Sequence, residues 1–482
     1  MNRPIVRLFW AVMLLFGVLI VGTTWNTVLG AQGLRDNPLN RRQLIEAQLV
    51  PRGTIYAADH RTVLAHSHPA PGGIYVRDYP QGPPFAHAVG YSYLSIGQAA
   101  LERTANDALT GQTESVSGIL DQLQGRRRVG DDVVTTLDAG AQRLAYDQLA
   151  GNRGSVVALD PATGRVLVLA SRPSYDPNSL GTPGVFSRLN LQTGTAPLVD
   201  RATQSGYPPG STFKTVTAAA ALDSGRYTPS STVNGNSPQT FSGQPLSNDG
   251  NQSFGPVDLT TALTQSINTV WANVAVGLGR STMGDYMRRF GFYRQPPLDL
   301  PANEVAASGE RLRGRLIPPT SSYVDLGRMG IGQDKLSVTP LQMAMVAAAI
   351  ANGGRLMRPH LVDRVLDRDG RTVSHVASQP ESTVMSGDAA GKLGAMMARV
   401  VQEGTGTAAA LSGVSVAGKT GTAEVGRGRN QVWFIAFAPV NHPRVAISVT
   451  LENQDSSAFG GPVAGPIAKA VLQRLLGAAA GG

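Results

Sequence analysis

The residues of this chain best suited to chemistry begin with a serine that precedes a lysine by three positions. Ser211 and Lys214 close the stretch that starts at Pro208, and a mostly apolar run follows as far as Ser224. On a helix, residues three apart share one face, so a hydroxyl would lie beside an amine able to take its proton. Proline and glycine just before Ser211 predict a helix start, where the helix dipole favours a developing anion. We expect this helix to end at Gly225.

The use of lysine at position 214 strengthens this interpretation. The chain has 42 Lys and Arg residues together, yet lysine stands only at 214, 335, 392, 419 and 469. Of these, only Lys214 has a serine or threonine three residues before it. The spacing by itself is a weak sign of catalysis, because serine and lysine often share the surface of a helix. Lysine can lose its proton at an accessible cost and arginine cannot, which favours Lys214 as a base.

Two further motifs occur once each, and both carry groups that suit the same chemistry. Ser266-Ile267-Asn268 lies between helices expected at 258–265 and 269–276, a place where serine and asparagine often serve only as caps. Lys419-Thr420-Gly421-Thr422 follows a strand expected at 414–417. Glycine lets a substrate backbone approach closely, and the hydroxyls of Thr420 and Thr422 are suited to binding a carboxylate.

The elements that must position these motifs alternate between strands and helices. β-branched and apolar runs predict a hairpin from 155–159 and 165–170, and three more strands at 414–417, 432–438 and 444–451. A helix is expected at 462–476. Strands at both ends of a helical middle predict a mixed α/β domain with one antiparallel sheet and helices on both of its faces.

The part of the chain before this domain predicts a small α+β module. A hairpin is expected from 52–57 and 63–65, followed by helices at 96–109 and 139–150 and a strand at 133–136. The charged run at 126–132 is typical of a solvated connector. We therefore divide the chain into a tip and anchor at 1–30, a module at 31–150 and a main domain at 151–482.

The N-terminus predicts one membrane anchor. Arg3 and Arg7 precede an uncharged stretch from Leu8 to Leu34, and roughly 20 apolar residues suffice to cross a bilayer. Positive charge stays on the cytoplasmic side, so the rest of the chain would be exported. The alternative is a cleaved signal peptide with its site at Gly30 and Ala31. We favour the anchor, because the apolar run is longer than an ordinary signal core.

Composition excludes several other classes of function. The chain has 482 residues and no cysteine, so it has no thiol nucleophile and no disulfide. Its net charge of +9 is spread along the chain without a basic-aromatic motif, which disfavours nucleic acid and favours an anionic envelope or membrane surface. His66 and His68 are spaced like metal ligands, but no acidic or histidine cluster accompanies them, and we predict no metal site and no cofactor.

The three motifs in this order resemble those of the penicillin-binding proteins and serine β-lactamases. The resemblance extends over most of 151–482 and implies a five-stranded antiparallel sheet between helices. It includes the segments 158–164, 171–178, 332–342, 349–354 and 433–439.

The N-terminal module resembles the pedestal, or dimerisation-type, domain of class B penicillin-binding proteins. The segments that carry this likeness are 52–55, 87–91 and 97–111. Only ~120 residues separate the anchor from the main domain, which is small for a glycosyltransferase domain. The resemblance therefore implies a partner that polymerises the glycan, namely a polytopic SEDS-type glycosyltransferase, together with other cell-wall synthesis proteins.

The resemblance also implies a reaction: D,D-transpeptidation of peptidoglycan stem peptides during cell-wall growth or division. Ser211 would attack the penultimate D-Ala carbonyl, Lys214 would accept its proton, and Ser266 would relay a proton to the leaving amine. Asn268 would hold Lys214 or the substrate amide. Lys419 would lower the pKa of Lys214, and Thr420, Gly421 and Thr422 would bind the substrate. The backbone N–H groups of Ser211 and Thr422 would form an oxyanion hole. The resemblance also implies that β-lactams acylate Ser211.

Two other functions remain open at this point. A D,D-carboxypeptidase or β-lactamase would use water in place of the acceptor amine, although the anchor and pedestal argue against this class. The other is a non-catalytic scaffold or β-lactam sensor: the intact Ser211, Lys214 and Lys419 argue against a dead enzyme, and a single anchor leaves no room for a membrane-embedded signalling module.

Overall fold

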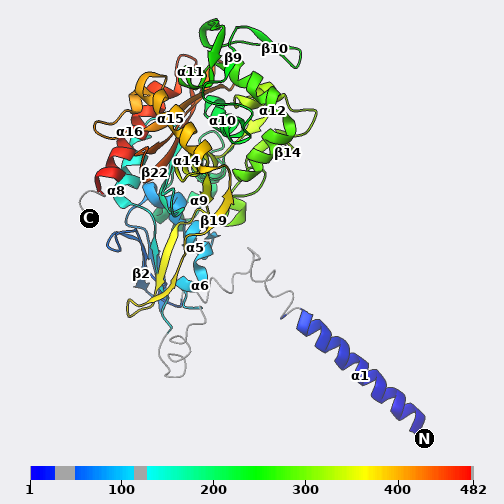
Figure 1. The fold of residues 1–482 in the computed structure, drawn as a ribbon. Coiled ribbons are helices and arrows are strands. Elements are labelled where there is room, and N and C mark those ends of the chain that lie inside the picture. The colour runs from blue at the N-terminus through cyan, green and yellow to red at the C-terminus, as the bar shows by residue number, and fades with distance from the viewer. Residues whose placement is uncertain (1, 26, 28–48, 113–127, 479–482) are drawn as a thin grey trace.

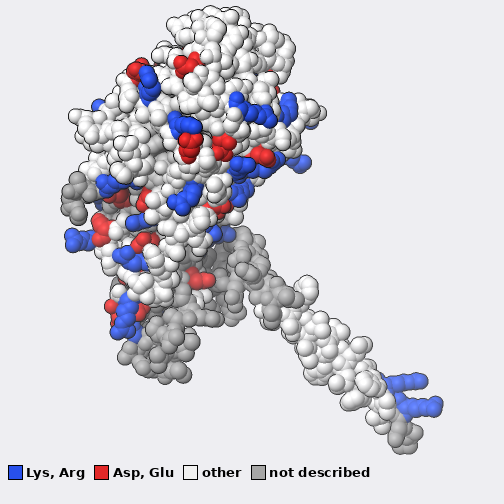
Figure 2. Space-filling view, viewed as in Figure 1, with Lys and Arg blue, Asp and Glu red and all other residues white. Residues whose placement is uncertain are grey.

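The computed structural model describes residues 2–25, 27, 49–112 and 128–478 (Figure 1). Among them, one helix is long and apolar enough to cross a membrane, and it is α1 (Asn2–Thr24). Its apolar side chains are exposed, and Figure 2 shows basic side chains at its N-terminal end. The cleavage site that the alternative of a signal peptide would use, at Gly30 and Ala31, lies outside the described residues, as do the first residues of the charged connector.

The main domain is built on one antiparallel sheet in the order β20-β21-β22-β7-β8. Its strands are β20 (Ala417–Glu424), β21 (Arg429–Ala438), β22 (Val445–Asp455), β7 (Gly154–Leu159) and β8 (Val166–Arg172). β22 pairs with β7 from Ala446 opposite Leu159 to Leu451 opposite Gly154. Strands from both ends of the domain therefore meet in one sheet, and the predicted five-stranded sheet is confirmed.

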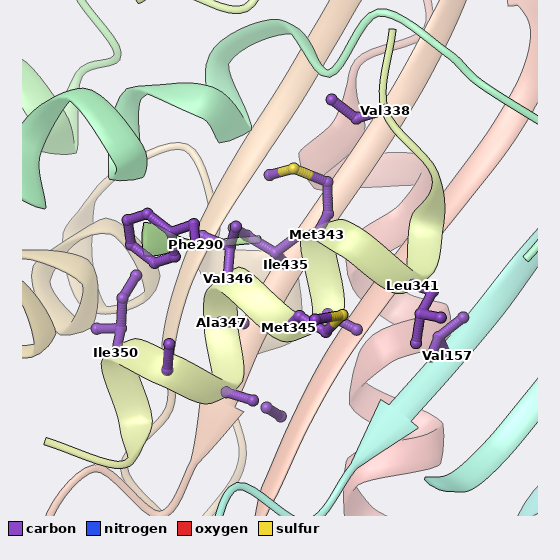
Figure 3. Close-up of a cluster of buried hydrophobic side chains, with 14 of the residues drawn as sticks. Val157, Phe290, Val338, Leu341, Met343, Met345, Val346, Ala347, Ile350 and Ile435 are labelled. Carbon is purple, nitrogen blue, oxygen red and sulfur yellow. The ribbon is translucent and has the colours of Figure 1, made fainter. Parts of the chain in front are cut away.

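Helices cover both faces of this sheet. One face packs against α8 (Ala139–Gln148) and α16 (Gly460–Ala478), and the other against α14 (Pro340–Ala351) and α15 (Gly387–Glu403). Behind the second face lie α10 (Lys214–Asp223), α11 (Leu259–Thr264) and α12 (Asn268–Arg289). Neighbouring strand residues such as Val156 and Val157 enter separate cores on the two faces, as a pleated strand requires. Figure 3 shows Val157 and Ile435 beside the apolar side chains of α14.

The N-terminal module has a six-stranded sheet in the order β18-β17-β6-β1-β2-β3. Its strands are β1 (Ile55–Tyr56), β2 (Val63–Ala70), β3 (Ile74–Asp78), β6 (Asp132–Thr135), β17 (Val362–Leu366) and β18 (Thr372–His375). The last two come from far along the chain, and the yellow hairpin runs down toward the blue strands in Figure 1. The module therefore borrows a hairpin from within 151–482, which the linear division of the chain does not anticipate.

The remaining described elements are short. The strands are β4 (Ser92–Tyr93), β5 (Gly97–Gln98), β9 (Thr232–Asn234), β10 (Gln239–Phe241), β11 (Gln244–Leu246), β12 (Pro256–Asp258), β13 (Gly309–Leu312), β14 (Arg315–Leu316), β15 (Leu336–Ser337), β16 (Arg355–Met357) and β19 (Pro380–Thr383). The helices are α4 (Ala86–Val89), α5 (Ala100–Thr104), α6 (Asn106–Leu109), α9 (Val185–Asn190) and α13 (Leu326–Gly330).

Three sequence expectations differ from the structure. The helix expected at 96–109 is instead β5 followed by α5 and α6, which are separated at Ala105. The helix expected at 269–276 continues to Arg289. The Lys-Thr-Gly motif does not follow a strand at 414–417 but lies inside β20, which begins at Ala417. Gly421 and the preceding Gly418 suggest a strand end, but pairing with β21 continues through both residues.

Candidate active site

Ser211 lies in a tight turn that leads into α10. This 3-10 turn, η4 (Gly210–Phe213), ends where α10 begins at Lys214, so the α-helix starts three residues later than Ser211. Residues i and i+3 eclipse each other in a 3-10 turn, and the two side chains therefore still share a face. Ser211 is partly exposed, whereas Lys214 is fully buried.

The turn is held by direct backbone contact with neighbouring segments. Gly210 N–H donates to Gly332 O at 2.9 Å, and Trp433 Nε1–H donates to Pro208 O at 2.9 Å. Gly421 of β20 packs so closely that an added Cβ would lie 2.7 Å from Pro209 O. The nucleophile turn and the Lys-Thr-Gly strand therefore touch backbone to backbone.

Lys214 Nζ is anchored on the Ser-Ile-Asn motif. It donates to Ser266 O at 2.7 Å, to Ser266 Oγ at 3.2 Å and to Asn268 Oδ1 at 2.7 Å. Burial lowers the pKa of Lys214 well below its usual range, nearby Lys419 lowers it further, and Asp249 acts in the opposite direction. A neutral amine is therefore favoured at this position, as a proton acceptor needs to be.

Lys419 approaches the same hydroxyl from β20. Its Nζ donates to Ser266 Oγ at 3.0 Å and to Thr420 O at 3.1 Å. Burial lowers the pKa of Lys419 to about 7, although Asp249 opposes this shift. Ser266 Oγ can accept from both amines through its two lone pairs, which leaves its own O–H able to donate toward the cleft.

The hydroxyls after Lys419 complete one side of the site. Thr420 Oγ1 shares a hydrogen bond of 2.7 Å with Thr405 Oγ1, and Thr422 Oγ1 accepts from Gly460 N–H at 3.2 Å. A cleft of about 990 Å³ opens over these groups. The predicted site residues that line it are Ser211, Ser266, Asn268, Thr420, Gly421 and Thr422, and Lys214 and Lys419 are buried beside them.

Several residues of the site were not identified from the sequence. Thr405 contacts the Lys-Thr-Gly motif, and Asn248 accepts hydrogen bonds from Thr269 N–H and Thr269 Oγ1. Asp249 accepts from Asn268 Nδ2 at 3.3 Å. These residues belong to polar loops whose composition indicates only a turn, so no local signal marks them.

In the part of the chain that the structure describes, no three His, Asp or Glu side chains gather as a metal site would require. His66 instead lies beside Asp78, with 3.7 Å between Nδ1 and Oδ2. The expectation that the chemistry needs neither metal nor cofactor stays a prediction.

The fold and this constellation define the class of the protein. The family model of the penicillin-binding protein transpeptidase domain matches residues 154–473, and that of the penicillin-binding protein A dimerisation domain matches residues 52–133. The chain belongs to the penicillin-binding protein family of transpeptidases. The resemblance drawn from the three motifs is thereby confirmed.

Individual members of this family are similar to the chain over most of its length. The chain is 36% identical over 99% of both lengths to the peptidoglycan D,D-transpeptidase PbpA of Mycolicibacterium smegmatis. It is 31% identical to the peptidoglycan D,D-transpeptidase MrdA of Escherichia coli, over 83% of this chain and 71% of that one. The penicillin G acyl-enzyme complex of penicillin-binding protein A from M. tuberculosis matches with a TM-score of 0.79 and 33% identity, covering 89% of this chain and 100% of that chain.

Proposed function

We propose that this protein is a peptidoglycan D,D-transpeptidase that works through an acyl-enzyme on Ser211. The observation that carries the proposal is the position of Ser266 Oγ, 3.2 Å from one buried lysine amine and 3.0 Å from another, on the cleft that Ser211 also lines. The names of the relatives from M. smegmatis and E. coli support the same reaction.

In the acylation step, Ser211 Oγ attacks the carbonyl carbon of the penultimate D-Ala of a stem peptide. Neutral Lys214 takes the hydroxyl proton while the new ester bond forms. The C–N bond to the terminal D-Ala then breaks, and the leaving amine receives a proton from Ser266, which is resupplied through its hydrogen bonds with the two lysines. Asn268 holds Lys214 in place throughout.

Substrate binding falls to the β20 side of the cleft. Lys419, Thr420 and Thr422 bind the terminal carboxylate, and Gly421 lets the substrate backbone approach. The backbone N–H groups of Ser211 and Thr422 serve as the oxyanion hole, and fixed donors of this kind contribute roughly 3 kcal/mol each.

The acyl-enzyme is resolved by an amine of a second stem peptide. The amine attacks the ester carbonyl, the acyl C–O bond to Ser211 breaks as the new amide bond forms the cross-link, and the proton lost by the amine returns to the Ser211 oxygen. A β-lactam enters by the same route: Ser211 Oγ attacks the lactam carbonyl, the ring C–N bond opens, and an ester to Ser211 remains.

The location follows from α1. We propose a single-pass anchor with Arg3 and Arg7 on the cytoplasmic side and the catalytic domain outside. The glycan strands come from a separate polymerase, for which a polytopic SEDS-type glycosyltransferase is the candidate. We also propose that the chain divides into a tip and anchor at 1–30, a pedestal at 31–150 and a catalytic domain at 151–482. The hairpin of β17 and β18 lies within the last range but pairs with the pedestal sheet.

The proposal is tested first by covalent labelling of the full chain in detergent with fluorescent penicillin. The wild type is expected to be labelled stably, and Ser211→Ala is expected to remain unlabelled. Ser230→Ala, which removes an exposed hydroxyl from a loop that does not line the cleft, is the matched control. Labelling of the Ser211→Ala variant would overturn the assignment of the nucleophile.

Labelling does not distinguish a transferase from a hydrolase. The second test supplies polymerised glycan that carries stem peptides and analyses the digested product. Cross-linked dimers are expected. Trimmed monomers alone would favour a D,D-carboxypeptidase, and rapid loss of the penicillin label would favour a β-lactamase.

A further inference from the structure

One carboxylate on the cleft wall has no role in the mechanism above. Asp249 begins the short 3-10 turn η5 (Asp249–Asn251), its side chain is exposed, and it lines the cleft. Asn268 Nδ2 donates to Asp249 Oδ1 at 3.3 Å, while Asn268 Oδ1 accepts from Lys214 at 2.7 Å. A single amide group therefore separates Asp249 from the proposed base.

The other charged residues of the cleft wall are mostly paired. Arg328 contacts Asp325 at 2.7 Å, and Lys335 contacts Asp334 at 2.7 Å. Arg429 is paired with Asp455. Within the described ranges, the ion pairs of the protein include neither Asp249 nor Glu424, the last residue of β20.

Asp249 is also presented from a fixed backbone. The side chain of the preceding residue, Asn248, is buried, and its Nδ2 donates to Gly235 O at 3.0 Å and to Gln252 O at 2.9 Å. Its Oδ1 accepts from Thr269 N–H at 2.9 Å. These bonds hold the backbone that carries Asp249, so little of the loop has to be ordered when a ligand binds.

The charge of Asp249 reaches the reacting groups. It opposes the effect of burial on the pKa of both Lys214 and Lys419. Because burial lowers the pKa of both amines, the carboxylate of Asp249 on the cleft wall remains open to a cation from the substrate.

We propose that Asp249 binds a free ammonium group of a stem peptide, and that the cleft thereby selects stems whose diamino acid has an unblocked side-chain amine. This inference rests on the proposed transpeptidase function. An alkyl amine with a pKa of about 10.4 is cationic at neutral pH, and a cation is what a carboxylate without an ion-pair partner binds. The ammonium belongs either to the donor stem, before acylation, or to the acceptor stem, before the amine yields its proton and attacks the ester.

The donor arm of the test measures the rate of Ser211 acylation by two peptides that end in D-Ala-D-Ala. One carries a lysine with a free side-chain amine, and the other carries the same lysine acetylated. If the donor supplies the ammonium, the wild type prefers the free amine about three- to five-fold, as expected for a solvent-accessible ion pair. Asp249→Asn keeps an oxygen for Asn268 but abolishes the preference, and Asp249→Glu keeps part of it.

The acceptor arm starts from the preformed acyl-enzyme and measures its partition between nucleophiles. If the acceptor supplies the ammonium, Asp249→Asn lowers capture by the side-chain amine of Nα-acetyl-lysine about three- to five-fold. Capture by hydroxylamine, which is neutral at pH 7.5, stays unchanged. In each arm the two rates are compared as a ratio within one variant. Any effect of Asp249 on the pKa of the lysines cancels in that ratio, because it acts equally on both peptides or both nucleophiles.

Glu424→Gln is the matched control, because it removes the other unpaired carboxylate from the same cleft. Loss of selectivity in either arm with Asp249→Asn, and not with Glu424→Gln, supports the proposal. Equal losses of selectivity in both variants would mean a general effect of cleft charge and would overturn the proposal. The proposal is also overturned if the wild type shows no selectivity for the free amine in either arm. The same holds if Asp249→Asn leaves that selectivity unchanged. Penicillin labelling distinguishes a failure of this inference from a failure of the proposed function. If the wild-type protein is not labelled, the transpeptidase function itself is refuted.

Discussion

Ser266 is the residue at which the three motifs converge. It adopts φ of 58°, in the left-handed region that non-glycine residues rarely occupy, and only 6% of it is exposed. This conformation directs both its carbonyl and its hydroxyl to Lys214 while Lys419 approaches the hydroxyl. Strained backbone of this kind is typical of functional sites, where surrounding contacts hold it.

A first prediction concerns the proton acceptor. Lys214→Arg is expected to lower the rate of penicillin acylation by about 10²- to 10⁴-fold, because a guanidinium does not give up its proton. The rate is measured by stopped labelling with fluorescent penicillin. Lys392→Arg, on the exposed surface of α15, is the control and should leave the rate unchanged.

Because a buried arginine can unfold the site, Lys214→Met is made in parallel. It retains the length of the side chain without a charge, and its melting temperature shows whether the fold survives. Acylation at the wild-type rate in either variant would contradict the role of Lys214 as base.

A second prediction concerns pH. Burial places the pKa of Lys419 near 7, and its charged form, which binds the substrate carboxylate, is populated below that pH. The second-order rate constant of acylation reports the free enzyme and should therefore fall as pH rises through about 7. At the acidic end it should fall again as Lys214, whose pKa is also lowered, becomes protonated.

Lys419→Arg should abolish the alkaline decline, because arginine stays charged over this range. The two lysines titrate as a coupled pair, so the profile is compared between variants as a whole. A rate constant that stays level from neutral to alkaline pH in the wild type would show that the charge of Lys419 is not needed.

At the scale of elements, the active site depends on how closely β20 packs against the nucleophile turn. A Cβ at Gly421 would lie 2.7 Å from Pro209 O and 2.8 Å from Thr212 Cγ2, and one at Gly210 would lie 2.5 Å from Thr422 O. The absence of side chains at these two positions brings the Ser211 turn and Thr422 together, which the proposed oxyanion hole requires.

A third prediction follows from this packing. Gly421→Ala is expected to push β20 away from the turn, lowering the free energy of unfolding by about 1–3 kcal/mol and acylation by about 10²-fold. Gly391→Ala is the control, because Gly391 lies on α15 with open space at its Cβ position and alanine favours a helix. Denaturant unfolding and labelling rates check both variants, and normal acylation by Gly421→Ala would show that the contact is not critical.

At the scale of the whole molecule, the pedestal and the main domain are joined at several points. β17 completes the pedestal sheet, Thr104 Oγ1 donates to Asp299 O at 2.8 Å, and Ala100 N–H donates to a carboxylate oxygen of Glu304 at 3.1 Å. Within the pedestal, fully buried Glu102 accepts from Arg52 at 2.8 Å and from Arg77 at 2.5 Å. We infer that the two domains unfold together.

A fourth prediction tests this coupling. Glu102→Gln leaves two buried guanidinium groups without their counter-charge and should lower the free energy of unfolding by about 3 kcal/mol. A single cooperative denaturant transition is expected in both wild type and variant. Glu403→Gln, which breaks an exposed pair with Arg399, should change stability by about 1 kcal/mol or less. Two separate transitions would contradict the coupling of the domains.

Much of the fold was predictable because its signals are local. The hairpin of β7 and β8, the cap that Asp258 provides for α11 and the final helix follow from turn chemistry and periodicity. The extent of β20 was not predictable, because glycine disfavours strands unless a neighbouring segment needs the space. The borrowed hairpin at 362–375 was not predictable either, since nothing in its own sequence specifies so distant a partner.

The groups of the candidate site could be predicted from residue types and local spacing: Ser211, Lys214, Ser266 and Lys419 stand in single-copy motifs in a recognisable order, because the chemistry constrains both. The three-dimensional arrangement was needed to find that one hydroxyl lies between two buried amines and that Asp249 lines the same cleft. Such contacts join residues far apart in the chain. Their distances depend on how whole elements pack, and local patterns do not encode that packing.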